Sequence, residues 1–298
     1  MTMSIIKPNT LTASMLTSST VPETEYAAYS AITNYAVGSR SIYSNKIFEC
    51  VQTPNTGNTP GITPLYWADK GPTNRWAMFD SSVGSVTSIA SNLTVVMRPG
   101  AVGGLALLEL TGKQVDITMK DAPGGVVIYS KTVVLDGTMI TSFYEWFYVE
   151  FAQQTDLVLT DLPVHFVSNE LTIAITGTSI VGCGICKFGE VIEIGITQMG
   201  ASVGIVDYSK KTVDTFGNYV ITQRAFSKRS DIQVVTEKAS FNRIFRALAA
   251  LRATPCIYIG TETLGHEPLI VYGFYKDFSI DVAYSQTHLC NLSIEGLI

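Results

Sequence analysis

The sequence predicts a mainly β protein that is divided into several small domains and contains one well-defined helix. Short runs of apolar or alternating residues recur along most of the chain, and Gly, Pro, Asp and Asn separate them, as is typical of strands joined by turns. Only the segment 240–255 has apolar residues at helical spacing. The 298 residues allow two or three domains, at roughly 100–200 residues each.

Residues 1–25 are polar and rich in Thr and Ser, and they include Pro8 and Pro22. Since such a segment buries little apolar surface, we expect an extended N-terminal arm. It lacks the apolar stretch of a secretory signal peptide. The longest apolar run in the chain, Ala101 to Leu110, is half of the roughly 20 residues that a spanning helix requires. We therefore expect no cleaved export signal and no membrane insertion.

Residues 26–72 form a short unit that is rich in aromatic side chains and poor in aliphatic ones. A strand is predicted at 46–52, and the stretch 53–64 holds Asn, Gly and Pro residues that favour turns. The rings either form the core of this unit or stand on its surface, where aromatic rings stack on the apolar faces of sugars. Both alternatives stay open. The candidate carbohydrate-binding residues are Tyr29, Tyr35, Tyr43, Tyr66 and Trp67.

Residues 73–189 predict one all-β domain. Several short strands at close spacing are typical of a β-sandwich or jelly roll. The predicted strands are 88–97, 105–110, 115–120, 126–135, 143–151, 155–159, 171–176 and 181–188.

Residues 190–298 form a domain of different character, in which strands surround the one predicted helix. The helix follows Ser240, a suitable N-cap, and ends before Pro255. A sheet covered by one helix is an α+β arrangement. The apolar residues that share one helical face are Phe241, Ile244, Phe245, Leu248 and Leu251. The predicted strands are 191–196, 218–225, 231–236, 256–260, 269–275, 278–283 and 289–294.

The composition indicates a protein that assembles. Hydrophobic residues make up 46% of the chain and charged residues only 15%, whereas about 25% is typical of a soluble domain. The mean hydropathy is +0.25. Because small domains cannot hide so much apolar area internally, we expect partners to cover part of it, with a homo-oligomer among the expected states. The net charge of −5, without a clustered basic run, disfavours nucleic-acid binding.

A basic cluster at Arg224, Lys228 and Arg229 has two interpretations. It is either a solvated strand edge guarded by charge or a docking patch for an acidic neighbour. Together with Phe241 and Arg246 of the predicted helix, these residues are the candidate assembly interface.

The strongest enzyme-like pattern is the segment from Gly200 to Gly204, which matches the G-x-S-x-G motif of hydrolases. That motif requires a helix directly after the serine, and the residues after Ser202 do not predict one, so we expect a glycine-rich loop and no catalytic site. Cys183 and Cys186 form a C-x-x-C pair, but a structural zinc site needs two further ligands at matching distance. On a strand, positions i and i+3 also point to opposite faces. We expect no metal and no cofactor.

The five cysteines are odd in number and irregularly spaced, which predicts buried free thiols in a protein made in a reducing cytoplasm. The histidines His165, His266 and His288 lie far apart in the sequence, and their spacing does not suggest a metal triad.

The segment 31–67 resembles the small chitin-binding-type carbohydrate module, which is also found on phage tail proteins. The resemblance covers about one sixth of the chain and implies contact with a glycan. The residues that carry it are Ala31, Tyr35, Val37-Gly38, Ile42-Tyr43, Ile47-Phe48-Glu49-Cys50, Thr56-Gly57-Asn58-Thr59-Pro60 and Trp67.

Further segments resemble phage tail proteins that are sometimes described as carbohydrate-binding, and this resemblance spans nearly the whole chain. By analogy of pattern, the middle domain is similar to galactose-binding-like jelly rolls, and the C-terminal sheet and helix are similar to the tail-tube-like fold. Such a fold does not fix the function. The segments that carry the resemblance are 71–80 (GPTNRWAMFD), 224–229 (RAFSKR), 248–252 (LAALR), Pro255 and 272–280 (YGFYKDFSI).

The resemblance implies a non-enzymatic structural protein of a tailed-bacteriophage virion, at the tail tip, the baseplate or the site of fibre attachment. Its expected partners are other tail proteins, further copies of the chain and host cell-surface polysaccharide, which weak sites repeated around a ring would hold by avidity. A stand-alone glycan-binding adhesin is the alternative. A tail-associated glycan or peptidoglycan hydrolase is disfavoured, because no nucleophile or acid–base pair stands in a recognisable frame.

Overall fold

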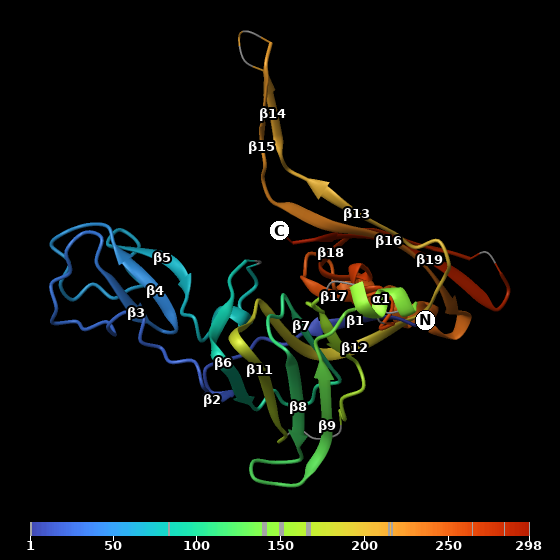
Figure 1. Cartoon of the computed structure of the whole chain (residues 1–298), viewed down its shortest axis with the longest axis horizontal. Coiled ribbons are helices and arrows are strands. Elements are labelled where there is room, and N and C mark those ends of the chain that lie inside the picture. Colours follow the sequence, from blue (N-terminus) through green and yellow to red (C-terminus); the bar gives the residue numbers. More distant parts are fainter. Residues whose placement is uncertain are drawn as a thin grey trace.

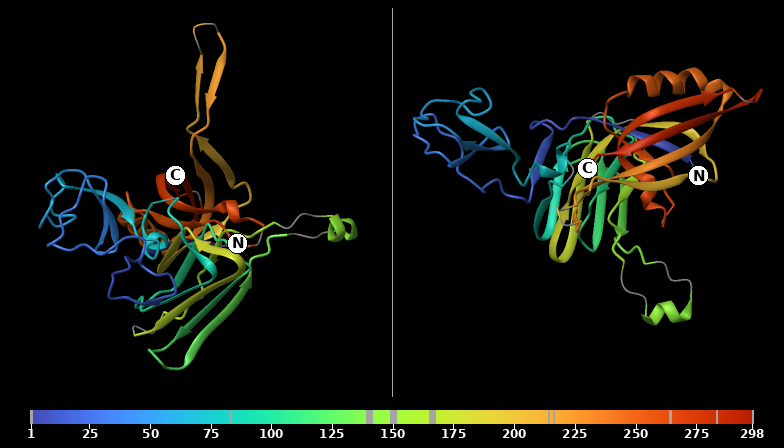
Figure 2. Two further views of the ribbon diagram at one scale, coloured as in Figure 1. Left: turned by 60° about the vertical axis from the view of Figure 1, so that its left-hand side comes forward. Right: turned by 90° about the horizontal axis from the view of Figure 1, so that it is seen from above.

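The computed structural model describes residues 2–82, 84–138, 142–148, 152–164, 168–213, 215, 217–263, 265–282 and 284–297. The fold is mainly β, as the sequence predicts, with strands β1 to β19 arranged in four sheets. Figure 1 shows a central β body from which a small module (blue) and a long hairpin (β14 and β15) project. Figure 2 shows a third projection, a loop that carries a short helix (green).

The largest sheet has nine strands and extends through the whole body. β12 also pairs with β16, through Ile196 opposite Val235 and Thr197 opposite Val234, so that the sheet curls back on itself. In spatial order the strands are β10 (Leu157–Leu159), β7 (Gly104–Leu108), β12 (Ile185–Thr197), β1 (Thr2–Pro8), β17 (Cys256–Ile259), β18 (Ile270–Asp281), β19 (Thr287–Gly296), β16 (Phe226–Glu237) and β13 (Ser202–Asp207).

A five-stranded sheet packs against the β10–β7–β12 end of the large sheet and completes the expected β-sandwich. In β8, the buried Val115, Ile117 and Met119 alternate with half-buried residues, so that one face of the strand turns inward. These side chains share one core with Leu107 of β7 and Phe188 of β12. In spatial order the strands are β2 (Leu16–Ser19), β6 (Thr87–Met97), β11 (Glu170–Cys183), β8 (Gln114–Lys120) and β9 (Val127–Val134).

The remainder of the large sheet surrounds a second core, which the helix α2 (Phe241–Ala250) covers. Ile244 and Leu248 of α2 are buried in this core together with Leu251, which confirms the predicted helix. Of the other two residues of the predicted apolar face, Phe241 is half-buried and Phe245 is 50% exposed. A short 3-10 turn, Lys238–Ser240, leads into the helix, and the Ser240 side chain makes no capping hydrogen bond. Burial of the apolar face, rather than a serine cap, therefore fixes α2 in place.

The strand β12 belongs to both cores, because Phe188 lies in the sandwich core and Ile194 in the second core. The expected domain boundary between residues 189 and 190 falls inside this strand, so the two parts of the body share a strand and are not joined by a linker. Gly189 lies where β12 passes from the first core to the second, and it faces the end of β1. A Cβ atom there would lie 1.9 Å from the Lys7 carbonyl oxygen, so β1 and β12 can approach this closely only because residue 189 has no side chain.

The N-terminal segment is not the free arm that its composition predicts. β1 lies in the interior of the large sheet, between β12 and β17. Ile5 lies opposite Ile192 on one side and Tyr258 on the other. Met3 and Ile5 are completely buried. The prediction failed because the average composition of residues 1–25 hides a short apolar run whose partner strands lie far away in the sequence.

The small module is an insertion between β2 and β6. It contains a three-stranded sheet of β3 (Arg40–Tyr43), β4 (Lys46–Cys50) and β5 (Trp67–Pro72). The chain leaves and re-enters the body at one neck, where Thr73 Oγ1 donates a hydrogen bond to Glu23 at 2.8 Å and Arg75 Nε donates one to the Val21 carbonyl at 2.7 Å. The 3-10 helix η1 (Ala77–Phe79) follows this neck.

One predicted strand is a helix. The sequence predicts a strand at 143–151, whereas the structure has the helix α1 (Phe143–Tyr148) there, and residues 149–151 lie outside the described residues. The Ser142 hydroxyl accepts a hydrogen bond from the Glu145 N–H at 3.2 Å, and the Glu145 carboxylate accepts one from the Ser142 N–H at 3.0 Å. This reciprocal pair is a capping box, which favours a helix start over a strand.

The predicted strand 218–225 is also different in the structure. Its first part, β15 (Tyr219–Thr222), pairs with β14 (Lys210–Val213) in a separate two-stranded sheet. β16 begins only at Phe226. The chain therefore leaves the body after β13, forms a hairpin arm and returns into β16.

Candidate interaction sites

The aromatic residues of the module form its core. Trp67 is only 3% exposed and packs with Phe48 and Cys50. Its Nε1–H donates a hydrogen bond to the Asn58 carbonyl oxygen at 2.8 Å. The half-buried residues that pack against this cluster are Tyr29, Tyr35 and Tyr66. Of the two alternatives left open by the sequence, core packing describes these four rings, and Trp67 presents no exposed face to a sugar.

Tyr43 and Tyr26 are the module's tyrosines with the most exposed rings. Tyr43 is 37% exposed, and its ring meets that of Tyr29 edge-on at 5.7 Å. Arg40 lies over the Tyr26 ring and donates hydrogen bonds to the Tyr26 hydroxyl at 2.9 Å and to Glu49 at 2.8 Å. The hydrogen bond from Arg40 holds the pKa of the Glu49 carboxyl below its usual range. Exposed rings beside charged hydrogen-bonding groups are suited to binding a sugar.

Sequence reasoning missed Tyr26, Arg40 and Glu49. The signal for the pair was present, because Arg40 and Glu49 lie at equal distances from the two-residue turn Ser44-Asn45. Both turn residues have positive φ, as a tight hairpin turn requires. The register of β3 and β4 then places Arg40 directly opposite Glu49.

The basic residues of the candidate assembly interface do not form one patch. Lys228 and Arg229 are neighbours in β16 and point to opposite faces of the sheet. Lys228 pairs with Asp156 at 3.1 Å, and Arg229 pairs with Asp231 at 3.0 Å. Arg224 is exposed before β16 begins, where the hairpin arm joins the body. β16 pairs with β13 and β19, so the interpretation of this cluster as a guarded strand edge is wrong.

Two clefts meet at the Lys228–Asp156 pair. The first, of about 390 Å³, has apolar walls that include Leu108, Ile185 and Tyr272. Among the described residues that line the two clefts, Lys228 is the only basic one. The acidic residues that line them are Glu109, Asp156 and Glu267. These clefts are therefore better suited to a neutral or basic partner than to an acidic one.

The two candidate interface residues of α2 have different environments. Phe241 is half-buried, and its ring lies edge-on to the buried His288 ring at 5.3 Å. Arg246 is exposed on the side of α2 that faces away from the sheet. Only Arg246 is therefore accessible as a contact for a partner.

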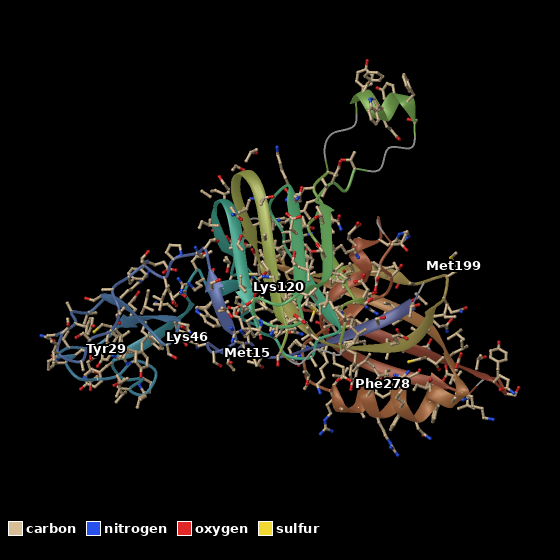
Figure 3. The ribbon with its side chains drawn as sticks, turned by 90° about the horizontal axis from the view of Figure 1, so that it is seen from below. Met15, Tyr29, Lys46, Lys120, Met199 and Phe278 are labelled. Atoms are coloured by element: carbon tan, nitrogen blue, oxygen red, sulfur yellow. The ribbon has the colours of Figure 1, made fainter. Side chains whose placement is uncertain are left out.

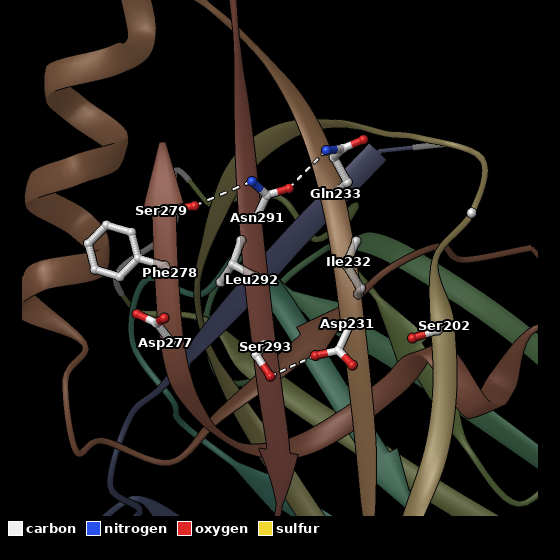
Figure 4. Close-up of a pocket in the computed structure, with 11 residues that line it drawn as sticks. Ser202, Asp231, Ile232, Gln233, Asp277, Phe278, Ser279, Asn291, Leu292 and Ser293 are labelled. Atoms are coloured by element: carbon white, nitrogen blue, oxygen red, sulfur yellow. Dashed lines mark hydrogen bonds between the residues drawn. The ribbon is translucent and has the colours of Figure 1, made fainter. Parts of the chain in front are cut away.

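A row of polar side chains crosses the sheet on the face opposite α2 (Figure 4). Ser293 donates a hydrogen bond to Asp231 at 2.6 Å, Gln233 donates one to Asn291 at 2.9 Å, and Asn291 donates one to Ser279 at 3.3 Å. The antiparallel register of β16, β19 and β18 brings these residues side by side. The row presents amide, carboxylate and hydroxyl groups to solvent.

Ser202, from the hydrolase-like motif, lies at the edge of this row. It begins β13, and a strand follows it where the hydrolase motif requires a helix. The register places Ser202 opposite Asp231. The strand–turn–helix of the hydrolase motif is therefore not formed here, and the glycine-rich loop expected from the sequence is a strand from Ser202 onward.

The cysteines are buried free thiols, as the sequence predicts. Cys183 and Cys186 lie in the same core rather than on opposite faces of one strand, because the single residue Gly184 separates β11 from β12. Burial raises the pKa of Cys186 to about 12 and the pKa of Cys183 well above its usual value. Both thiols therefore stay protonated at neutral pH.

Within the described part of the chain, no group of three or more metal-ligating side chains comes together. His165 lies outside the described residues. His266 precedes a 3-10 helix, η3 (Glu267–Leu269), and His288 is buried in β19. No helix among the described residues has the length and apolarity needed to cross a membrane.

Comparison with known proteins finds no relative: no family model matches the chain, and neither a curated protein nor a solved structure matches it.

Proposed function

We propose that this chain is a structural component of a bacteriophage tail, which assembles with copies of itself and with other tail proteins. The tail assignment is supported by the resemblance of the segment 31–67 to a carbohydrate module that is also found on phage tail proteins. It is also supported by the resemblance to tail proteins of the segments 71–80, 224–229, 248–252, Pro255 and 272–280. Exposed apolar side chains on the edge strand β13 and on the β14–β15 hairpin support the assembly role. The observation that carries this role is the hairpin arm formed by β14 and β15.

The hairpin arm has few contacts that stabilise it within its own chain. β14 and β15 pair with each other in a separate sheet, and all of their residues are exposed. In Figure 1 the arm stands away from the body as a continuation of β13 and β16. Tyr219 and Ile221 expose apolar side chains on one face of β15, and Val220 exposes one on the other. Since an isolated two-stranded hairpin is marginally stable in water, packing against another chain accounts best for this arm.

The edge of the large sheet beside the arm supports the same role. β13 is the last strand on this side of the sheet, and its Val203 and Ile205 are exposed. An exposed edge with apolar side chains is a surface to which another chain can add.

A deletion of the arm tests the assembly role. The variant replaces residues 210–222 with an Asn-Gly turn between Ser209 and Gln223, and the control is Val126→Ser in the exposed turn between β8 and β9. We expect the deletion to weaken self-association and binding to tail components in sedimentation velocity experiments, and the control to leave both unchanged. A wild-type chain that stayed monomeric at high concentration and bound no tail component would refute the assembly role.

We further propose that the small module contacts host-surface glycan through Tyr43, Tyr26 and Arg40. A glycan array should show binding that is lost in Tyr43→Ala and Tyr26→Ala and kept in Ile62→Ala, which removes an exposed side chain elsewhere in the module. Trp67→Ala is less informative, because Trp67 lies in the core. Binding to a defined sugar by a chain that does not assemble would favour the stand-alone adhesin instead.

A further inference from the structure

The helix α1 displays an exposed aromatic surface, which we call the aromatic tip (Phe143, Tyr144, Trp146, Phe147 and Tyr148). These side chains are 65–83% exposed, and no residue of α1 is buried. The rings contact one another, with Phe143 5.4 Å from Phe147 and Tyr144 4.7 Å from Tyr148. Figure 2 shows α1 standing clear of the body. An exposed apolar patch of this kind marks an interaction site.

The shape and charge of the aromatic tip restrict its partner. With 3.6 residues per turn, the rings cover every side of α1 except the one occupied by Glu145. The segment 136–153 contains Asp136, Glu145 and Glu150 but no lysine or arginine. A membrane rich in anionic lipid would repel such a segment, and so would the acidic clefts beside Lys228. A basic surface that accepts aromatic rings is therefore favoured.

The outer face of α2 offers such a surface. The segment 238–252 contains Lys238, Arg243, Arg246 and Arg252 but no acidic residue. Arg246 is exposed on the side of the helix opposite the buried Ile244 and Leu248. The exposed Ala249 and Ala250 lie on the same outer side, so flat rings can approach the helix closely.

The two surfaces complement each other. Guanidinium groups stack on aromatic faces, so an exposed arginine beside small residues suits the rings of the tip. One helix face can cover the three rings on one side of the tip, Phe143, Trp146 and Phe147, and would bury about 300–500 Å² there, since a buried aromatic side chain contributes about 150–250 Å² and these rings are 65–83% exposed. Stable protein interfaces bury about 800 Å² on each partner, so this contact is of the weak kind that gains strength when it is repeated around an assembly.

Within one molecule the two surfaces do not meet. Figure 3 and the right-hand view of Figure 2 both show α1 and α2 on opposite sides of the body. We infer that the aromatic tip of one copy docks on the arginine-bearing outer face of α2 in a second copy of this chain. This inference rests on the proposed assembly role and names one contact that produces it. The contact joins different surfaces of two copies, so its repetition gives a ring or a filament.

Two variants and their mixture test the inference. The tip variant carries Trp146→Ser and Phe147→Ser, and the face variant carries Arg246→Glu. All three positions are exposed, so the fold should be kept. The matched controls are Val126→Ser with Val127→Ser and Arg98→Glu, which change exposed residues of the sandwich.

In sedimentation velocity experiments, each variant alone should associate about tenfold more weakly than the wild type, because each lacks one anchor of the contact. Each variant retains the surface that the other has lost. An equimolar mixture should therefore form more dimer than either variant forms alone at the same total concentration, and the controls should associate like the wild type.

Three results would overturn the inference. If both variants associate as strongly as the wild type and only the arm deletion abolishes association, then the aromatic tip does not dock on α2. The proposed assembly role would still hold in that case. A mixture that forms no dimers would show that the two surfaces are not partners. A monomeric wild type that floats with phosphatidylcholine vesicles, while the tip variant does not, would identify a lipid surface as the occupant.

Discussion

Single residues determine whether the small module is folded, and Trp67 is the most important of them. The centroid of its ring lies 4.9 Å from that of Tyr35 and 6.0 Å from that of Tyr29. Replacing Trp67 therefore removes the packing partner of both tyrosine rings. The large aliphatic side chains Ile32, Ile62 and Leu65 are exposed and do not belong to this core, so they do not fill a cavity in its place. The exposed Tyr43, by contrast, is available for binding.

We expect Trp67→Ala to destabilise the module by about 3–5 kcal/mol, because it leaves a cavity in a very small core. Tyr43→Ala should cost much less, since this ring is already partly solvated. Hydrogen exchange measured by mass spectrometry over residues 40–72 would detect the difference as lost protection. Equal protection in the wild type and in Trp67→Ala would contradict the assignment of Trp67 to the core.

Buried thiols make the stability of the body sensitive to alkaline pH. Burial raises the pKa of Cys186 to about 12 and the pKa values of Cys256 and Cys290 to about 11, whereas an unfolded thiol ionises near 8.5. Only the unfolded chain ionises between these values. The stabilisation is therefore complete below about pH 8.5 and is lost as the pH rises through the folded values. The free energy of unfolding in urea should fall between pH 8 and pH 11.

The reactivity of the thiols provides an independent check. At pH 8 all five cysteines should react with a thiol reagent only after denaturant is added, since all are buried. Rapid labelling of the native protein would show that a thiol is accessible.

At the scale of elements, β1 is buried on both of its faces, because its side chains enter both apolar clusters that flank it. Ile5 lies in the core under α2, and Ile6 lies in the cluster formed with β7 and β17. The strand therefore connects the two clusters, as does its neighbour β17 through Tyr258 and Ile257.

Replacing Ile5 with Ala should lower the free energy of unfolding by about 2–5 kcal/mol, as is usual for a buried large-to-small change. The matched control is Ile180→Ala in β11, where the side chain is 64% exposed. The control should change stability by less than about 0.5 kcal/mol. Urea unfolding followed by circular dichroism measures both, and a similar small loss in the two variants would show that β1 is dispensable.

The elements differ in how well the sequence predicts them. α2 follows from its periodicity, and β8 follows from its alternation, because each pattern is local. α1 was missed because its run of aromatic residues favours a strand by propensity, although Ser142 and Glu145 carried the competing signal of a capping box. β1 was missed because what makes it a strand is its pairing with β12 and β17, which no local pattern in residues 1–25 records.

The candidate sites show the same limit. Aromatic enrichment drew attention to the module, but composition cannot tell a ring in the core from a ring on the surface. Tyr43 and Trp67 were therefore grouped together although their environments differ. The basic cluster was treated as one patch because Lys228 and Arg229 are adjacent, whereas strand geometry sends them to opposite faces.

At the scale of the whole molecule, the body and the module differ in independence. β12 runs through both cores of the body, so neither the sandwich nor the α2 part contains all of its own strands. The module joins the body at a neck. There the segment that enters the module and the segment that leaves it are held together by the hydrogen bond between Glu23 and Thr73. The body should therefore unfold as one unit, and the module should be removable.

We expect a chain in which Gly-Gly replaces residues 26–72 to keep the thermal midpoint of the body within about 4 °C, because the two ends of the neck are adjacent. Fragments 1–189 and 190–298, produced separately, should not fold, since the cut falls inside β12. Scanning calorimetry and circular dichroism check these outcomes. A folded 190–298 fragment would show that β1 and the first part of β12 are not required.

The position of β1 also sets the order of events during synthesis of the chain. After Ile5, the ribosome adds 253 residues up to and including its neighbour Tyr258, which takes about 13 to 50 s at about 5–20 residues per second. Throughout that interval the apolar side chains of residues 3–6 have left the ribosome while the strand on one side of them does not yet exist. We therefore expect β1 to complete its pairing only after β17 has been translated, however early the rest of the chain folds.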